Sequence, residues 1–283
     1  MKKGMEIISM KITIEHLNVL QIADSGQCFR MNRLEEGWFG LIAFGRFLRL
    51  RQPEPGVIEL SCNEEEYENI WRDYFDIDYD YGNVVQGLIK SGDEFLQKAA
   101  EYGPGIRILR QEPFEMLISF IISQNKNIPS IKTCIERICE RYGDGKTEPV
   151  TGMTYYAFPS PEQLAAAGKE ELRSLKLGYR DEYILSAARA VNEGAIDLEK
   201  LKWCTHEEAV KALKTIHGVG EKVANCVSLY GLHHIEAFPV DVWIKKILTE
   251  VYRGAFREDR YSGYAGIVQQ YMFYYIRALN QTK

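Results

Sequence analysis

The sequence predicts an α+β fold, in which an N-terminal antiparallel β-sheet domain with flanking helices precedes an all-helical domain. Alternating apolar and β-branched residues are confined to about the first sixty positions, and helical periodicity begins near Glu64. The 283 residues suffice for two domains, and no repeat or low-complexity tract interrupts them. A Gly-Pro-Gly tripeptide at 103–105 is the expected boundary, which gives domains of residues 1–105 and 106–283.

The expected strands alternate apolar with polar residues or are rich in β-branched residues. They are KITIEHL (11–17), FGLIAFG (39–45), FLRLRQ (47–52) and VIELSC (57–62). Turn-forming residues separate the strands, such as the Asp-Ser-Gly-Gln run at 24–27. Because an antiparallel sheet tolerates one apolar and one solvated face, we expect a sheet covered on one side.

From Glu64 onward apolar residues recur at helical spacing, and EEEYENIWRDYF (64–75) places acidic residues in its first helical turn. The helices expected after it span residues 83–90, 93–102, 112–124, 128–142, 161–167, 169–175, 180–193, 206–216, 221–231, 241–253 and 262–279. No apolar run approaches the ~18 residues of a membrane-spanning helix, so we expect no membrane partner.

The net charge of −5 argues weakly against nucleic acid binding, but the acidic residues are unevenly spread. Residues 51–101 carry a net charge of −9, which leaves +4 on the rest of the chain and permits a DNA partner. The six cysteines form no C-x-x-C pair, which is typical of free thiols in a reducing compartment, so we expect a cytoplasmic or nucleoid location. No cysteine follows Cys226, which excludes a cysteine-ligated iron–sulfur cluster after that position.

Residues 206–231 predict a helix-hairpin-helix motif, with the His-Gly-Val-Gly turn at 217–220 between two helices. The two glycines permit positive φ and leave backbone N–H groups uncovered at the start of the second helix. Such N–H groups can bind a phosphate oxygen of DNA without reading its sequence. A plain αα-hairpin with a glycine turn explains the same residues, so this motif alone leaves DNA binding open.

Lys222 lies in the first turn of the second helix, where the helix dipole disfavours a cation. A nucleophilic lysine must be a free amine, and a helix N-terminus and burial both favour that uncharged form. Asp241 precedes another amphipathic helix, where N-capping alone explains it. Opposite a reactive amine, the same carboxylate can also accept a proton and stabilise positive charge on a sugar.

These residues belong to a longer pattern that resembles the 8-oxoguanine DNA glycosylase/AP lyase family of the helix-hairpin-helix DNA glycosylase superfamily. The resemblance covers roughly residues 10–280. Its segments, in chain order, are SGQCFRM (25–31), YFDID (74–78), LRQEPFEMLISFIISQNKNI (109–128), FPS (158–160), LGYRDEY (177–183), GVGEKVANC (218–226), PVDVW (239–243) and AGIVQQYMF (265–273). The short chain without a cysteine cluster is similar to prokaryotic members.

The resemblance implies that Lys222 is a Schiff-base nucleophile and that Asp241 is its electrostatic and proton-transfer partner. The implied activity is excision of 8-oxoguanine from duplex DNA, then β-elimination at the abasic site, by a monomer that requires no cofactor. Two alternatives remain: a glycosylase of the same superfamily for a different damaged base, and a non-catalytic DNA-binding protein. The second explains the glycine turn but not Lys222.

The resemblance also implies a base pocket. Guanine N7 is an acceptor, and oxidation at C8 turns it into an N–H donor, which the Gly26 carbonyl would accept. Cys226 and Phe273 would hold the flipped base between them, and Gln269 would read its Watson–Crick edge. Without the resemblance, a turn glycine and two core residues explain Gly26, Cys226 and Phe273.

On the DNA side, the resemblance makes Asn125 the residue that fills the gap in the duplex and Tyr179 the wedge. Arg180, expected to be exposed beside Tyr179, would read the orphan cytosine. The remaining expected DNA contacts come from the hairpin and the following helix: His217, Gly218, Val219, Gly220 and Trp243. A structural cation at the hairpin is implied on the backbone carbonyls of Lys214, Ile216 and Val219.

Three positions depart from the family pattern, and at one of them Met31 replaces a tryptophan. Ser130 stands where eukaryotic members have a second arginine that reads the orphan cytosine, and losing a bidentate donor removes ~1–3 kcal/mol of discrimination. We therefore expect a relaxed preference for the base opposite the lesion. Trp243 replaces a histidine, and an indole packs and donates one hydrogen bond but does not titrate.

Overall fold

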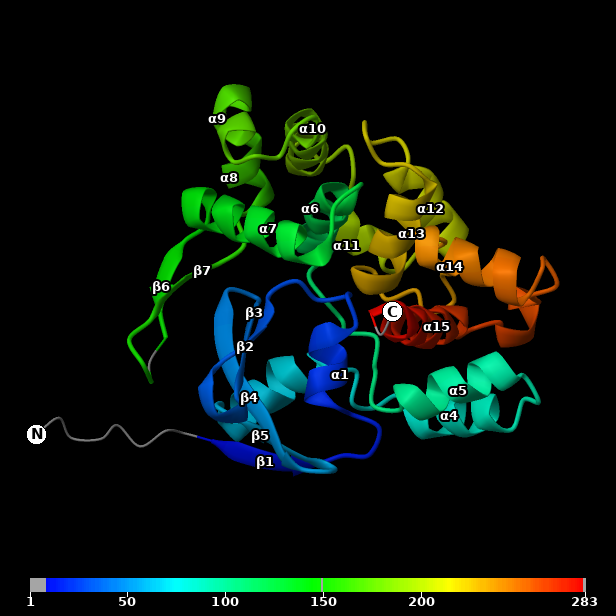
Figure 1. The fold of residues 1–283 in the computed structure, drawn as a ribbon. Helices are drawn as coiled ribbons and strands as arrows, with labels where there is room; N and C mark the ends of the chain where they lie inside the picture. Colours follow the sequence, from blue (N-terminus) through cyan, green and yellow to red (C-terminus); the bar gives the residue numbers. More distant parts are fainter. Residues whose placement is uncertain (1–8, 149, 282–283) are drawn as a thin grey trace, which may run out of the picture.

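The computed structural model describes residues 9–148 and 150–281 and confirms the α+β prediction (Figure 1). The N-terminal strands form a five-stranded antiparallel sheet with the order β1-β5-β4-β3-β2. The strands are β1 (Met10–Thr13), β2 (Met31–Arg33), β3 (Phe39–Ala43), β4 (Arg46–Glu54) and β5 (Val57–Leu60). A helix not expected from the sequence, α1 (Val19–Asp24), separates β1 from β2.

One face of this sheet is covered, as predicted. Leu48 and Leu50 of β4 and Leu60 of β5 are fully buried, and Leu50 pairs directly with Leu60. The covering residues come from α1, which contacts β4, and from the acidic helical segment α2 (Glu64–Glu66) to α3 (Arg72–Tyr74), which contributes the buried Trp71. Period-two burial therefore fixes the register of the sheet against this segment.

The remaining helices form a second hydrophobic core around α6, in which every residue from 115 to 122 is buried. The helices are α4 (Tyr81–Ile89), α5 (Glu94–Tyr102), α6 (Pro113–Ser123), α7 (Ile128–Tyr142), α8 (Pro161–Ala165), α9 (Lys169–Ser174), α10 (Arg180–Asn192), α11 (Leu198–Leu201), α12 (His206–Leu213), α13 (Glu221–Tyr230), α14 (Val242–Lys246) and α15 (Ala265–Gln281). The sequence did not predict α11 or the small hairpin of β6 (Gly145–Thr147) and β7 (Thr154–Tyr156). In the described ranges, no helix is long and apolar enough to span a membrane.

Helices α4 and α5 were expected to flank the sheet domain, but their apolar residues, such as Val84 and Leu96, belong to the helical core. Figure 1 shows the pair beneath α15, which α5 contacts directly. Most of the sheet core precedes α4, but Leu109 belongs to the sheet core and Phe29 to the helical core, so the boundary at 103–105 stays a prediction. The outer ends of the two expected domains, residues 1–8 and 282–283, lie outside the described residues.

Candidate active site

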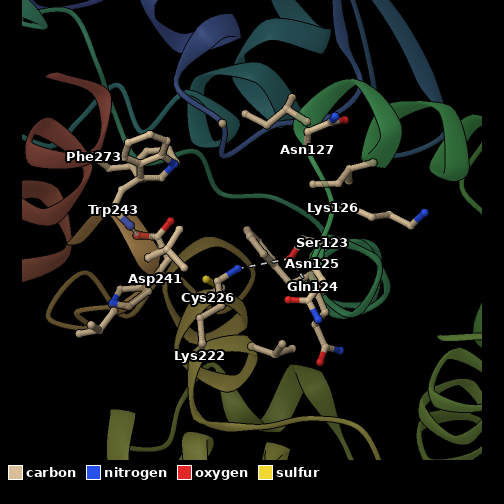
Figure 2. Close-up of a pocket in the computed structure, with 18 of the residues that line it drawn as sticks. Ser123, Gln124, Asn125, Lys126, Asn127, Lys222, Cys226, Asp241, Trp243 and Phe273 are labelled. Atoms are coloured by element: carbon tan, nitrogen blue, oxygen red, sulfur yellow. Dashed lines mark hydrogen bonds between the residues drawn. The ribbon is translucent and has the colours of Figure 1, made fainter. Parts of the chain in front are cut away.

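A pocket of about 890 Å³ opens between the α6–α7 connection, α13, the start of α14, and α15 (Figure 2). The expected site residues that line it are Gly26, Asn125, Gly220, Lys222, Cys226, Asp241, Trp243, Gln269 and Phe273. Figure 2 shows Lys222, Cys226 and Asp241 on one side of this space and residues 123–127 on the other. The fold therefore brings both expected catalytic residues and all four expected base-pocket residues to one cavity.

Lys222 lies in the first turn of α13, which begins after the extended residue Gly220. Its side chain is half-buried, and Nζ donates a hydrogen bond to Ser123 Oγ at 3.3 Å. Nζ also lies 5.0 Å from the centre of the Phe120 ring. Within the described ranges no carboxylate forms an ion pair with Lys222, so neutral groups alone hold the amine at the pocket wall.

Asp241 caps α14, as its local sequence predicts, and also faces the pocket. Its Oδ1 accepts hydrogen bonds from the N–H groups of Trp243 at 3.0 Å and Ile244 at 2.9 Å. In the described part of the chain, Oδ2 has no hydrogen-bond partner. Burial raises the pKa of Asp241, although the two amide bonds and the nearby Lys222 charge oppose that rise. A carboxylate with a raised pKa is a better proton acceptor.

The expected base-reading residues Gly26 and Gln269 line the same pocket. Gly26 adopts φ +81°, and a Cβ atom there would lie 3.1 Å from Phe273 Cε1, so the backbone passes close to the aromatic ring. Gln270 Nε2 donates to the Ser25 carbonyl at 2.8 Å and fixes the loop before Gly26. Gln269 is buried, and its Nε2 donates to the Pro239 carbonyl at 3.1 Å, which sets the orientation of its amide.

Burial raises the pKa of the Cys226 thiol, so the sulfur is neutral beside the lysine. Cys226 lies one helical turn after Lys222 on the same face of α13. A neutral thiol does not compete with Asp241 for the proton of the amine. It offers a polarisable contact surface to whatever fills the pocket.

Comparison with known families accounts for almost all of the described fold. Residues 9–117 match the family described as 8-oxoguanine DNA glycosylase, N-terminal domain. Residues 118–260 match the HhH-GPD superfamily of base excision DNA repair proteins. The chain belongs to the 8-oxoguanine DNA glycosylase family. The resemblance predicted from the sequence motifs is thereby confirmed.

Individual proteins similar to this chain are also N-glycosylase/DNA lyases. The N-glycosylase/DNA lyase of Saccharomyces cerevisiae is 35% identical over 202 residues, which are 68% of this chain and 53% of the yeast protein. The chain thus spans about half the length of that relative. The probable N-glycosylase/DNA lyase of Methanothermobacter thermautotrophicus is 31% identical over 232 residues, 72% of either protein.

A solved structure of Clostridium acetobutylicum 8-oxoguanine glycosylase/lyase, in complex with double-stranded DNA containing cytosine opposite 8-oxoG, is also similar. It superimposes with a TM-score of 0.88 and 37% identity, and the match covers 94% of this chain and 93% of that one.

The expected wedge region of this family member lies beside the pocket rather than in it. Tyr179 is 49% exposed, as a wedge requires, and its hydroxyl accepts a hydrogen bond from Asn125 Nδ2 at 3.2 Å. The expectation that Arg180 is exposed is wrong. Its guanidinium is buried, stacks 4.4 Å from the centre of the Tyr179 ring and donates to the carbonyls of Leu177 and Gln124. Reading a base would require this arginine to leave those partners.

The hairpin presents His217 and Gly220 at the surface. Gly218 adopts φ +87°, and any Cβ atom there would overlap the Tyr183 ring at 2.1 Å, so packing alone requires this glycine. The Ile216 carbonyl accepts the Val219 N–H at 3.1 Å, which leaves that oxygen one lone pair for a cation. The hairpin cation and the DNA contacts of these residues stay predictions.

The sequence motifs assign no role to Ser123, Phe120, Tyr230 or Arg277, which also line the pocket. Phe120 and Tyr230 stack with their ring centres 5.4 Å apart beneath the pocket. Arg277 lies over the Phe273 ring at 5.3 Å and donates to the Asp24 carbonyl at 3.1 Å. The spacing i,i+4 from Cys226 to Tyr230 and from Phe273 to Arg277 was the signal that would have found two of them.

Proposed function

We propose that the chain is a monomeric DNA glycosylase and AP lyase that removes 8-oxoguanine from duplex DNA and needs no cofactor. One observation carries this proposal: the primary amine of Lys222 and the carboxyl group of Asp241 lie in the same pocket. No described carboxylate pairs with the amine, and burial raises the pKa of Asp241. An amine and a proton acceptor at one wall of a cavity large enough to admit a base are the groups that covalent excision needs. Because the proposed substrate is chromosomal DNA, we infer that the enzyme acts in the cytoplasm, at the nucleoid.

The reaction follows from these two groups. The Lys222 Nζ lone pair forms a bond to the deoxyribose C1′, and the glycosidic bond breaks with its electron pair leaving on the base. Asp241 stabilises the positive charge on the sugar and takes a proton from the nitrogen. The C1′–O4′ bond then opens as the imine forms, and O4′ takes up the proton that Asp241 accepted. Loss of a C2′ proton expels the 3′ phosphate, which cuts the strand 3′ to the lesion.

Lesion choice in this proposal depends on the Gly26 carbonyl. An acceptor aimed at position 7 of the purine accepts the N–H of 8-oxoguanine and repels the lone pair of guanine. A site built around such a hydrogen bond rejects the partner that lacks it strongly. The flipped base would lie between Cys226 and Phe273, both of which line the pocket. The loop that carries Gly26 is held by Gln270, so the carbonyl needs little reorganisation.

The test is strand cleavage of labelled duplexes that each carry one lesion: 8-oxoguanine, an alkylated adenine or an oxidised pyrimidine. We expect cleavage of the 8-oxoguanine duplex and none of undamaged DNA. Preference for another lesion would favour the alternative glycosylase activity. Binding without cleavage of any duplex would favour the non-catalytic DNA-binding alternative.

A further inference from the structure

Ser123 is the last residue of α6, and its hydroxyl oxygen accepts a hydrogen bond from Lys222 Nζ (Figure 2). We propose that Ser123 is a positioning residue, which holds the Lys222 amine so that its lone pair faces into the pocket. This inference rests on the proposed function, because it needs Lys222 to be the nucleophile. It concerns a residue to which neither the sequence motifs nor the proposed chemistry assigns a role.

The Ser123 hydroxyl already uses its proton in a hydrogen bond within α6. Oγ donates to the Phe120 carbonyl at 2.7 Å. That carbonyl is in the last turn of α6, where helical acceptors lack N–H partners. The next N–H group, from Gln124, bonds to Ile121 instead, so Ser123 supplies the donor that Phe120 needs. A hydroxyl has only one proton, and Oγ therefore meets Lys222 as an acceptor alone.

An acceptor-only hydroxyl fixes the orientation of the amine. One N–H bond of Nζ must point at Ser123 Oγ. A second N–H bond, which carries partial positive charge, is attracted to the face of the Phe120 ring, whose centre is 5.0 Å from Nζ. Both of these partners belong to the α6 side of the pocket. The remaining tetrahedral direction of the nitrogen faces away from α6, toward the α13 side of the pocket, where the neutral Cys226 thiol also interacts with Lys222. This direction carries the third proton in the ammonium and the lone pair in the free amine.

This arrangement favours attack because the proton held by neither Ser123 nor Phe120 is the one that leaves. Its departure creates the lone pair on the open side of the nitrogen, toward the incoming C1′ atom. The 3.3 Å separation of Nζ and Oγ is long for a hydrogen bond, as is common in free enzymes before substrate tightens the site. A serine able to donate its proton to Nζ would instead occupy the lone pair.

The experiment isolates the amine step by using duplex DNA that already contains an abasic site. Lys222 Nζ adds to the C1′ aldehyde and loses water, and borohydride then delivers hydride to the imine carbon, giving a stable amine. Trapping rates are measured under single-turnover conditions for the wild type and for Ser123→Ala. The matched control is Ser119→Ala, which removes a hydroxyl one turn earlier on α6; Ser119 Oγ is buried and has no hydrogen-bond partner in the described structure.

A second pair of variants keeps the test informative if Ser123→Ala folds poorly. Ser123→Thr and Ser123→Val have the same shape, and only the threonine keeps the hydroxyl. Affinity for duplex DNA with a tetrahydrofuran abasic analogue is measured alongside, because that analogue cannot form an imine. A role limited to capping the end of α6 would change folding or this affinity, not the trapping rate alone.

We expect Ser123→Ala and Ser123→Val to slow trapping about three- to tenfold, with DNA affinity unchanged and Ser119→Ala and Ser123→Thr close to wild type. The deficit should persist from about pH 6 to 9, since orientation rather than ionisation is lost. Equal trapping by the threonine and valine variants, or a deficit that vanishes at high pH, would overturn the inference. Absence of trapping by the wild type would instead refute the proposed function.

Discussion

Replacing Gly26 by alanine tests whether the loop beside the base pocket is shaped for its occupant. Gly26 adopts φ +81°, in the region that side chains with a Cβ atom avoid at a cost of about 1–2 kcal/mol. The new methyl group would lie 3.1 Å from Phe273 Cε1, 3.3 Å from Arg277 Nη1 and 3.4 Å from Ile128 Cδ1. All three contacts are with side chains, which shift by a few tenths of an ångström, so the backbone contributes most of the destabilisation.

We therefore expect Gly26→Ala to lower the free energy of unfolding by about 1–2 kcal/mol. Its effect on excision should be larger, because moving the Phe273 ring narrows the space against Cys226. Small displacements at a reacting centre cost large factors in rate, and we expect excision of 8-oxoguanine to slow about tenfold or more. Urea unfolding and single-turnover cleavage of an 8-oxoguanine duplex measure the two effects separately.

Gly37→Ala is the matched control for this experiment. Gly37 has nearly the same backbone conformation, with φ +76°, but no atom lies within 4 Å of the position of its added Cβ atom. It should lose similar stability and keep full activity. If Gly26→Ala cleaves as fast as the wild type, or Gly37→Ala is equally slow, the pocket does not depend on the Gly26 loop as we argue.

Three further predictions concern charge and pairing. If Ser130 stands at the position of the family's second arginine, as the resemblance implies, excision rates opposite the four bases should differ by less than about a hundredfold, and a larger preference for cytosine would contradict this. Asp241→Asn should slow strand cleavage about 10²- to 10⁴-fold, because asparagine does not accept the proton. It should not lower the free energy of unfolding at neutral pH, because asparagine also caps α14 and because burial, which raises the pKa of Asp241, disfavours its charged form. Burial raises the pKa of Glu115 from 4.5 to about 8, so as pH rises this carboxyl group ionises at a lower pH in the unfolded chain than in the folded protein. Wild-type stability should then fall between about pH 5 and 8 relative to Glu115→Gln, and parallel stability curves would refute it.

The strands and long helices were predictable because their period follows directly from burial on one face. Leu48 and Leu50 alternate in β4, and the apolar run of α6 is long enough to be a buried helix. Short elements such as α1 and α11 carry too few turns to show a period. The packing of α5 against α15 joins segments far apart in the chain, which local patterns do not report.

The candidate site also contains residues that local sequence reveals and contacts that it does not reveal. Lys222 and Asp241 were recognisable because each occupies a helix start, a position that the sequence reveals. The inward turn of Arg180 depends on the carbonyl of Gln124, which lies 56 residues away in the chain. The contact of Ser123 with Lys222 spans 99 residues. Neither contact leaves a local trace, so only the three-dimensional structure reveals them.

The central claim is that the amine of Lys222 attacks the sugar. Its most direct test is borohydride reduction during cleavage of an 8-oxoguanine duplex, followed by proteolysis and mass spectrometry of the cross-linked peptide. We expect the adduct on Lys222 in the wild type and no adduct with Lys222→Gln, although that variant still binds the duplex. An adduct on another residue, or strand cleavage by the wild type without any adduct, would contradict the account.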